Sequence, residues 1–184
     1  LPDEEIVVTD ILDGSTVYTP PPASKIEERL NVFFAFANND DEYIHPVLKG
    51  IILHFWMAYE HPFYDGNGRA SRAIFYWYML KNKYWAFEFL SLSSIILRSR
   101  TKYDRAFLYT EYDECDLTYF IFFNVRAIKR AFEELSKYLI RKEAEKVGST
   151  RLIRKFPGLN ARQYQILSQA LIDPNKHFTI NNHV

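Results

Sequence analysis

Apolar side chains recur at helical spacing along most of the chain. Residues 45–60 are apolar on nearly every face, as is typical of a helix in the centre of a bundle. Other stretches carry a helical apolar pattern, which predicts helices over roughly 24–38, 69–83, 91–99, 102–112, 116–147 and 160–173. The pattern therefore predicts a mainly all-α fold, a helical bundle.

The first residues follow a different pattern, with two short β-prone runs on either side of a turn. Ile6 to Val8 and Thr16 to Tyr18 flank Asp13-Gly14, and an Asp-Gly pair between such runs is a strong hairpin signal. Three prolines at 20–22 cannot continue a strand ladder and end the hairpin. We therefore expect one β-hairpin ahead of the helices.

Two side chains mark where helices begin. Ser24, followed three residues later by Glu27, has the form of a capping box that opens the first helix. Asp116 is placed to cap the long helix that follows it. Because the composition changes after Gly148-Ser149-Thr150, we expect that helix to end near Val147.

Composition narrows the class of protein. A chain of 184 residues is one domain, or one domain with a small appendage. Its 23 basic and 23 acidic side chains give a formal net charge of zero, so the charge does not indicate a protein that coats nucleic acid or binds an anionic membrane. Cys115 is the only cysteine, which excludes an internal disulfide and favours a reducing compartment. No apolar stretch reaches the eighteen or so residues of a membrane span, and we expect a fragment of a longer, bacterial, cytoplasmic protein.

The chemistry is concentrated between His61 and Arg72. Glycines at 66 and 68 let backbone N–H groups point inward together just where a new helix begins, which makes an anion-binding cradle. Arg69 and Arg72 lie three residues apart, so they share a helix face and can both reach phosphates. Asp65 is placed to hold a hard cation such as Mg²⁺. An imidazole at position 61 can accept a proton near neutral pH.

Each of these residues alone more often has a purely structural role, and two metal sites can be excluded. A calcium loop needs oxygen ligands where Arg69 and Ala70 stand. A zinc site of His54 and His61 fails, because seven residues on a helix separate them by about 10 Å. Only the joint occurrence of the glycines, arginines, Asp65 and His61 favours phosphate chemistry.

The segment resembles the motif of the Fic family, His-x-Phe-x-(Asp/Glu)-Gly-Asn-Gly-Arg-x-x-Arg, at all eight specified positions: His61, Phe63, Asp65, Gly66, Asn67, Gly68, Arg69 and Arg72. The resemblance extends from the hairpin to the end of the long helix. It implies a Fic-type helical bundle with a β-hairpin flap over the active site. Residues 1–22 would form the flap, 23–150 the core with the loop 61–72, and 151–184 a tail that opens a winged helix-turn-helix domain.

The resemblance also implies an activity, the transfer of AMP from Mg-ATP to a Tyr, Thr or Ser hydroxyl of a target protein with release of pyrophosphate. His61 would be the base and Asp65 the Mg²⁺ ligand. The phosphates would be bound by Gly66, Asn67, Gly68, Arg69 and, at the γ-phosphate, Arg72. Phe63 would be a buried anchor that fixes the loop. Tyr103 would lie beside the adenine or serve core packing.

Target binding would fall to the flap strand, whose backbone pairs with the target chain as an added strand. Its residues would be Ser15, Thr16, Val17 and Tyr18, although a hairpin that merely covers the bundle is the alternative. The inhibitory motif of many relatives, (Ser/Thr)-x-x-x-Glu-(Gly/Asn), is not found, and we expect it upstream of Leu1.

Other functions stay open at this point. The same motif supports removal of AMP from a modified protein in some relatives. Phosphate transfer is disfavoured, because the relatives that phosphorylate carry Lys where Gly68 stands. A nucleotide-sensing DNA-binding regulator is a further alternative, since residues 141–163 hold seven Lys or Arg against two Glu. Self-modification, homodimer formation and DNA binding through the C-terminal region remain open as well.

Overall fold

The computed structural model describes residues 8–9, 16–39, 43–153 and 158–172. The chain divides into two compact units, Leu1–Ala131 and Phe132–Val184. Helices make up most of the described residues, so the prediction of a mainly all-α fold is confirmed. The predicted boundaries of flap, core and tail are functional divisions and stay predictions.

Two short strands precede the helices. β1 (Val8–Thr9) and β2 (Thr16–Tyr18) pair antiparallel, with Val8 opposite Tyr18. The turn expected at Asp13-Gly14 lies outside the described residues. The pairing is consistent with a hairpin, whereas the action of this hairpin as a flap stays a prediction.

The chain enters the bundle through a 3-10 turn, η1 (Ala23–Lys25), and then α1 (Ile26–Asn38). The predicted capping box at Ser24 is wrong, because Ser24 lies inside this turn and no side-chain hydrogen bond caps α1. A side chain of α1 instead holds the chain that precedes the helix. Arg29 donates to the carbonyl oxygens of both Pro21 and Pro22, at 3.4 and 3.1 Å.

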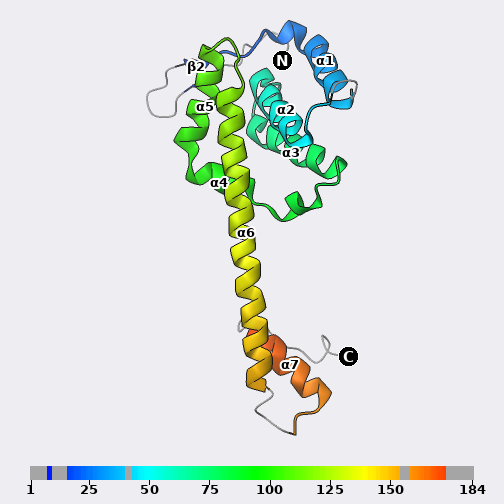
Figure 1. The fold of residues 1–184 in the computed structure, drawn as a ribbon. Coiled ribbons are helices and arrows are strands. Elements are labelled where there is room, and N and C mark those ends of the chain that lie inside the picture. The colour runs from blue at the N-terminus through cyan, green and yellow to red at the C-terminus, as the bar shows by residue number, and fades with distance from the viewer. Residues whose placement is uncertain (1–7, 10–15, 40–42, 154–157, 173–184) are drawn as a thin grey trace. The chain divides into compact units, whose positions relative to one another are not determined.

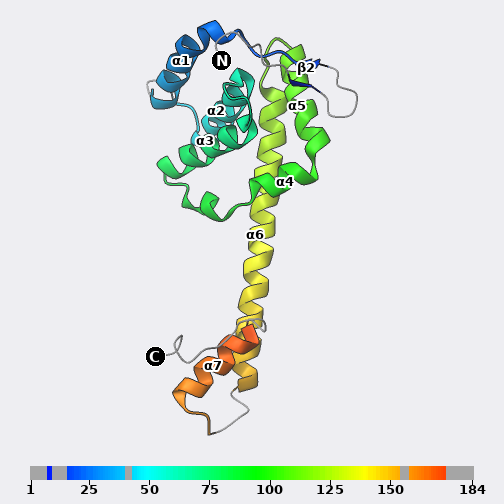
Figure 2. The same ribbon diagram turned by 180° about the vertical axis from the view of Figure 1, so that it is seen from behind.

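Helices α2 (Pro46–Glu60) and α3 (Asn67–Lys81) form the central pair. Gly50 leaves room for side chains of α3, because a Cβ at this position would lie 2.5 Å from the terminal methyl of Met79 and 3.3 Å from the ring of Phe75. Figures 1 and 2 both show the two helices side by side. The loop 61–66 that joins them therefore lies at one end of a tightly packed helix pair.

The remaining helices of the first unit surround the start of α6. Asp116 accepts the Thr118 amide at 2.8 Å, so the predicted cap of this long helix is confirmed. Figures 1 and 2 place α2 and α3 on one side of its first turns and α4 and α5 on the other. The elements are η2 (Trp85–Phe89), a 3-10 turn that the pattern did not predict, α4 (Leu92–Arg98), α5 (Arg100–Tyr112) and α6 (Thr118–Ile153).

Aromatic side chains fill the centre of this unit. Phe120 of α6 is fully buried, and its ring centroid lies 4.5 Å from Phe107, 5.2 Å from Phe55 and 5.3 Å from the imidazole of His54. Burial of such a ring contributes about 1.5–3 kcal/mol, and well-placed aromatic pairs add to it. Residues 54 and 55 of α2 are thus fixed against α5 and α6, one and a half turns before the loop begins.

The second unit holds the end of α6 and helix α7 (Ala161–Ile172), which confirms the short helix predicted over 160–173. Asn160 and Gln163 make the reciprocal side-chain to amide bonds of a capping box, at 2.8 and 3.0 Å. A winged helix stays a prediction.

Helix α6 passes through Gly148 and ends only at Ile153, so its predicted end near Val147 is wrong. Glycine in a helix interior costs only about 1 kcal/mol, and a Cβ at Gly148 would meet nothing within 4 Å. No helix in the described ranges is long and apolar enough to span a bilayer.

Candidate active site

The loop between α2 and α3 is defined by left-handed backbone at both ends. His61 ends α2 with φ 47° and ψ 49°, and Pro62 behind it cannot continue the helix. Gly66 precedes α3 with φ 93°, a conformation that glycine adopts without steric cost. The two turns bring the chain back on itself, so that His61 and the start of α3 belong to one compact loop.

Asn67 closes this loop. Its side-chain oxygen accepts the Phe63 amide at 2.9 Å, and its side-chain nitrogen donates to the Phe63 carbonyl at 2.5 Å. Asn67 is 4% exposed, whereas the Phe63 side chain is 49% exposed. The prediction that Phe63 is a buried anchor is therefore wrong, because the buried amide of Asn67, four residues on, holds the Phe63 backbone instead.

The start of α3 presents free amides. The N–H groups of Arg69 and Ala70 both donate to the Gly66 carbonyl at 2.9 Å. Within the described part of the chain, the N–H groups of Asn67 and Gly68 have no acceptor. Because the Asn67 side chain is hydrogen-bonded to the backbone of Phe63, Asn67 can offer an anion only its backbone amide. Two unpaired amides at the positive end of a helix are what an anion site requires.

Asp65 lies at the mouth of this site and is largely exposed. Its carboxylate pairs with Arg69 at 3.0 Å and accepts the Gly66 amide at 2.6 Å. Among the described residues, no three His, Cys, Asp or Glu side chains gather as a metal cage. A single accessible carboxylate nevertheless suits Mg²⁺, which is commonly held by one or two carboxylates together with substrate phosphates and water.

A cavity of about 370 Å³ joins these groups. It brings together every core residue predicted for the site, namely His61, Asp65, Gly66, Asn67, Gly68, Arg69, Arg72 and Tyr103. Three further residues line it, Tyr64, Ile96 and Arg100, which the sequence reasoning missed. Tyr64 occupies an unspecified position of the motif, and Ile96 and Arg100 reach the cavity only through the packing of α4 and α5. Three arginines against one carboxylate favour an anionic ligand.

Arg72 lies beside two buried polar side chains. Its positive charge lies near the Tyr103 phenol, whose hydroxyl lies 3.0 Å from Nε2 of His54. Burial lowers the pKa of His54 to about 3, so this imidazole is neutral at pH 7 and its Nε2 can accept a hydrogen bond from the Tyr103 hydroxyl. Burial also raises the pKa of Tyr103, so its hydroxyl stays protonated. Tyr103 and His54 thus form a buried polar pair beside Arg72, within the aromatic core.

Nδ1 of His61 lies 3.2 Å from the Ala58 carbonyl. A carbonyl only accepts, so the proton of the neutral ring resides on Nδ1 and the lone pair on Nε2. The imidazole is therefore oriented by the end of α2, with its basic nitrogen available at the cavity that His61 lines.

The two residues before His61 connect it to the start of the chain. Glu60 is 3% exposed and pairs with Arg29 at 2.6 Å, while Trp56 donates to its other oxygen at 3.1 Å. Tyr18 donates to the Tyr59 carbonyl at 2.8 Å, so its side chain is directed into the bundle. Of the other predicted flap residues, Ser15 lies outside the described residues, and Thr16 and Val17 are described only as part of β2.

Comparison with known proteins agrees with this geometry. Residues 4–79 match the model of the Fic/DOC family. The chain is 25% identical over 117 residues, 63% of its length, to "Protein adenylyltransferase Fic" of Nematostella vectensis. It is 33% identical over 58 residues, 31% of its length, to the protein of the same name from Aedes aegypti.

The helix pair that carries the His-to-Arg motif around the anion cavity lies almost wholly within the matched segment. Residues 4–79 therefore match the Fic/DOC family, and the chain is similar to proteins named protein adenylyltransferase. The matched regions span 26% and 12% of the length of these two relatives.

Proposed function

We propose that this chain transfers AMP from ATP to a hydroxyl of a target protein. The relatives named protein adenylyltransferase support this class of reaction. The observation that carries the proposal is the cavity itself, where an oriented imidazole shares one space with a helix start and three arginines. That combination supplies a proton acceptor and a polyphosphate site side by side.

In the proposed reaction, the target hydroxyl oxygen attacks the α-phosphorus of ATP. A bond forms between this oxygen and the α-phosphorus, and the bond from the α-phosphorus to the bridging oxygen breaks. Pyrophosphate leaves with that electron pair, and Nε2 of His61 takes the hydroxyl proton. A base placed in this way typically contributes about 10²–10⁴-fold in rate.

The phosphates would be bound by the start of α3. The amides of Asn67 and Gly68 are free to donate to phosphate oxygens, and Arg69 and Arg72 lie on the same helix face. A Cβ at Gly68 would lie 3.2 Å from the Arg72 guanidinium, so a side chain there would crowd the space in which Arg72 meets a phosphate. We assign the γ-phosphate to Arg72, as predicted.

Asp65 would hold Mg²⁺ together with the nucleotide, and the ion would neutralise charge on the phosphates. To do so its carboxylate must exchange at least part of its contact with Arg69. Both side chains are mostly exposed, and an exposed ion pair of this kind contributes only about 0.2–1 kcal/mol, so the exchange is cheap.

The position of the attack can be tested with labelled ATP. Incubation of the protein with a responsive target and Mg²⁺ should transfer label from the α-phosphorus and none from the γ-phosphorus. Intact mass spectrometry should find the mass of one AMP added to a Tyr, Thr or Ser. Label arriving from the γ-position would contradict the proposed function, although the site assignment would stand.

Arg72 offers a second test, because the proposed γ-phosphate contact exists only with ATP. Arg72→Ala should weaken the binding of ATP at least about tenfold and the binding of ADP much less, since a charge-assisted hydrogen bond to the γ-phosphate is lost. Titration calorimetry of both nucleotides measures the difference.

Arg105→Ala is the matched control, because this exposed arginine of α5 does not line the cavity. It should leave both affinities unchanged. Equal losses of ATP and ADP binding in Arg72→Ala would show that Arg72 contacts another group or only supports the fold.

A further inference from the structure

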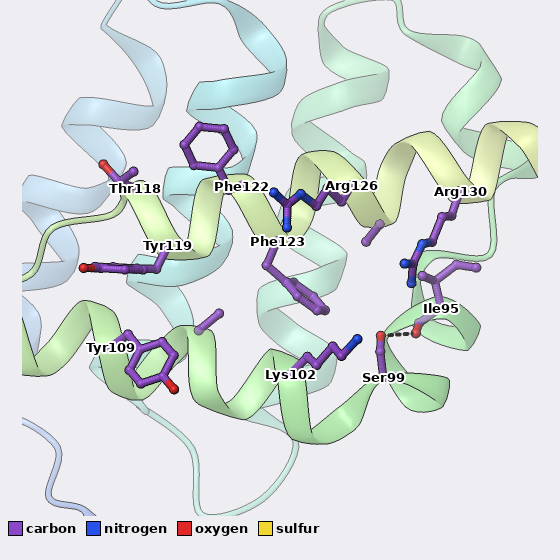
Figure 3. Close-up of a pocket in the computed structure, with 12 residues that line it drawn as sticks. Ile95, Ser99, Lys102, Tyr109, Thr118, Tyr119, Phe122, Phe123, Arg126 and Arg130 are labelled. Carbon is purple, nitrogen blue, oxygen red and sulfur yellow. Dashed lines mark hydrogen bonds between the residues drawn. The ribbon is translucent and has the colours of Figure 1, made fainter.

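A second cavity, of about 430 Å³, lies where α4, α5 and the first turns of α6 meet (Figure 3). It shares no lining residue with the active-site cavity. Helix α5 separates the two, since Arg100 and Tyr103 line the active site, whereas Lys102, Ala106 and Tyr109 line the second cavity. Its volume falls within the roughly 300–1,000 Å³ typical of small-ligand sites.

One part of this cavity is strongly cationic. Lys102 of α5 lies on one wall, and Arg126 and Arg130 of α6 lie on the other (Figure 3). None of the three forms an ion pair with another described residue, and no acidic side chain lines the cavity. Two arginines one helical turn apart repel each other, which costs a few tenths of a kcal/mol. A bound anion would remove that repulsion.

The other part of the cavity is aromatic. Tyr109 and Tyr119 lie with their ring centroids 5.7 Å apart, and Phe123 points from α6 toward α5 beside them, whereas Phe122 extends to the other side of α6 (Figure 3). Tyr109 is 51% exposed and Tyr119 44% exposed, so these rings offer open faces to a ligand. The negative charge of Asp113 raises the pKa of the Tyr119 phenol, and Asp113 itself does not line the cavity.

We propose that this cavity is a second ligand site, for a nucleoside phosphate. The base would stack on the rings of Tyr109 and Tyr119, and the phosphates would pair with Lys102, Arg126 and Arg130. Aromatic stacking contributes about 1–3 kcal/mol per base, and arginine is well suited to phosphate. The aromatic end of the cavity suits a planar base and the cationic end suits phosphates, and a nucleoside phosphate carries both groups. This site does not depend on the proposed AMP transfer.

Photoaffinity labelling separates the two cavities. The full chain is irradiated with 8-azido-ADP, digested, and the modified peptides are identified by mass spectrometry. Label is expected on peptides that contain Tyr109 or Tyr119, separately from any label near Tyr64 or Tyr103 in the active site. Excess ADP should remove it, whereas excess adenosine alone should compete at least about tenfold less well, because it lacks the phosphates.

The variant Arg126→Gln/Arg130→Gln should lose this labelling at least about tenfold. The control Arg105→Gln/Lys129→Gln removes two exposed charges from α5 and α6 outside the cavity and should keep it. Circular dichroism checks that both variants fold. Labelling confined to the active site, or equal labelling in both variants, would overturn the proposal. So would displacement by a short RNA but not by ADP, because the ligand would then be a nucleic acid.

Discussion

His61→Asn is expected to reduce AMP transfer by about 10²–10⁴-fold while nucleotide binding stays close to that of the unchanged protein. His61 has φ 47°, and asparagine tolerates left-handed backbone better than most residues, so the loop should keep its shape. The amide can still donate a hydrogen bond near the Ala58 carbonyl, but it cannot accept a proton in the way an imidazole does. Initial rates with labelled ATP and a responsive target measure the loss.

His45→Asn serves as the control for this experiment. His45 caps the other end of α2, where its Nδ1 accepts the Val47 amide, and asparagine is a good cap. This variant should transfer AMP at the unchanged rate. A His61→Asn protein that also retains the full rate would show that the base lies elsewhere, and calorimetry with ATP would tell that result apart from a loss of binding.

Arg29→Ala is expected to lower the free energy of unfolding of the first unit by about 2–4 kcal/mol. It leaves the carboxylate of Glu60 buried without its cation, and breaking a buried pair on one side typically costs about 3–5 kcal/mol. We place the effect somewhat lower, because Trp56 still donates to this carboxylate and Arg29 is partly exposed. The same change frees the carbonyls of Pro21 and Pro22.

Urea unfolding followed by tryptophan fluorescence measures this loss. All three tryptophans, at 56, 77 and 85, lie in the first unit, so the signal reports on that unit. Adding Glu60→Gln to Arg29→Ala should recover part of the stability, since a neutral amide costs less to bury. The exposed Arg105→Ala should change it by less than about 0.5 kcal/mol. No recovery in the double variant would mean that Glu60 is not the group left unpaired.

The helices of the first unit could be predicted because their apolar spacing is set locally and tertiary packing does not oppose it. The candidate site could be predicted because its chemistry lies in one short loop, where His61, Asp65 and the glycines are close in sequence. The same reasoning could not find Arg100 or Ile96, since only the tertiary arrangement of α4 and α5 brings them to the cavity.

The errors have physical causes that pattern reasoning does not weigh. Phe63 was expected to bury itself as large aromatics normally do, but a polar side chain, Asn67, fixes the loop through the backbone. Ser24 resembles a cap, yet Arg29 satisfies the carbonyls ahead of α1 and the chain makes a 3-10 turn there instead. Gly148 was read as a helix stop, although one exposed glycine costs too little to end a long helix.

The last turn of α2 receives three attachments in consecutive residues. Tyr18 of β2 bonds to the carbonyl of Tyr59, Arg29 holds Glu60, and the imidazole of His61 is turned by Ala58 of the same turn. β2 and the imidazole of His61 are thus held by the same turn of α2. If a target peptide pairs with β2, each of its residues would lie at a fixed distance from Nε2 of His61, because this helix end holds both the strand and the imidazole. Selection of an acceptor residue would then follow from its offset along the target strand as well as from the side chain it carries.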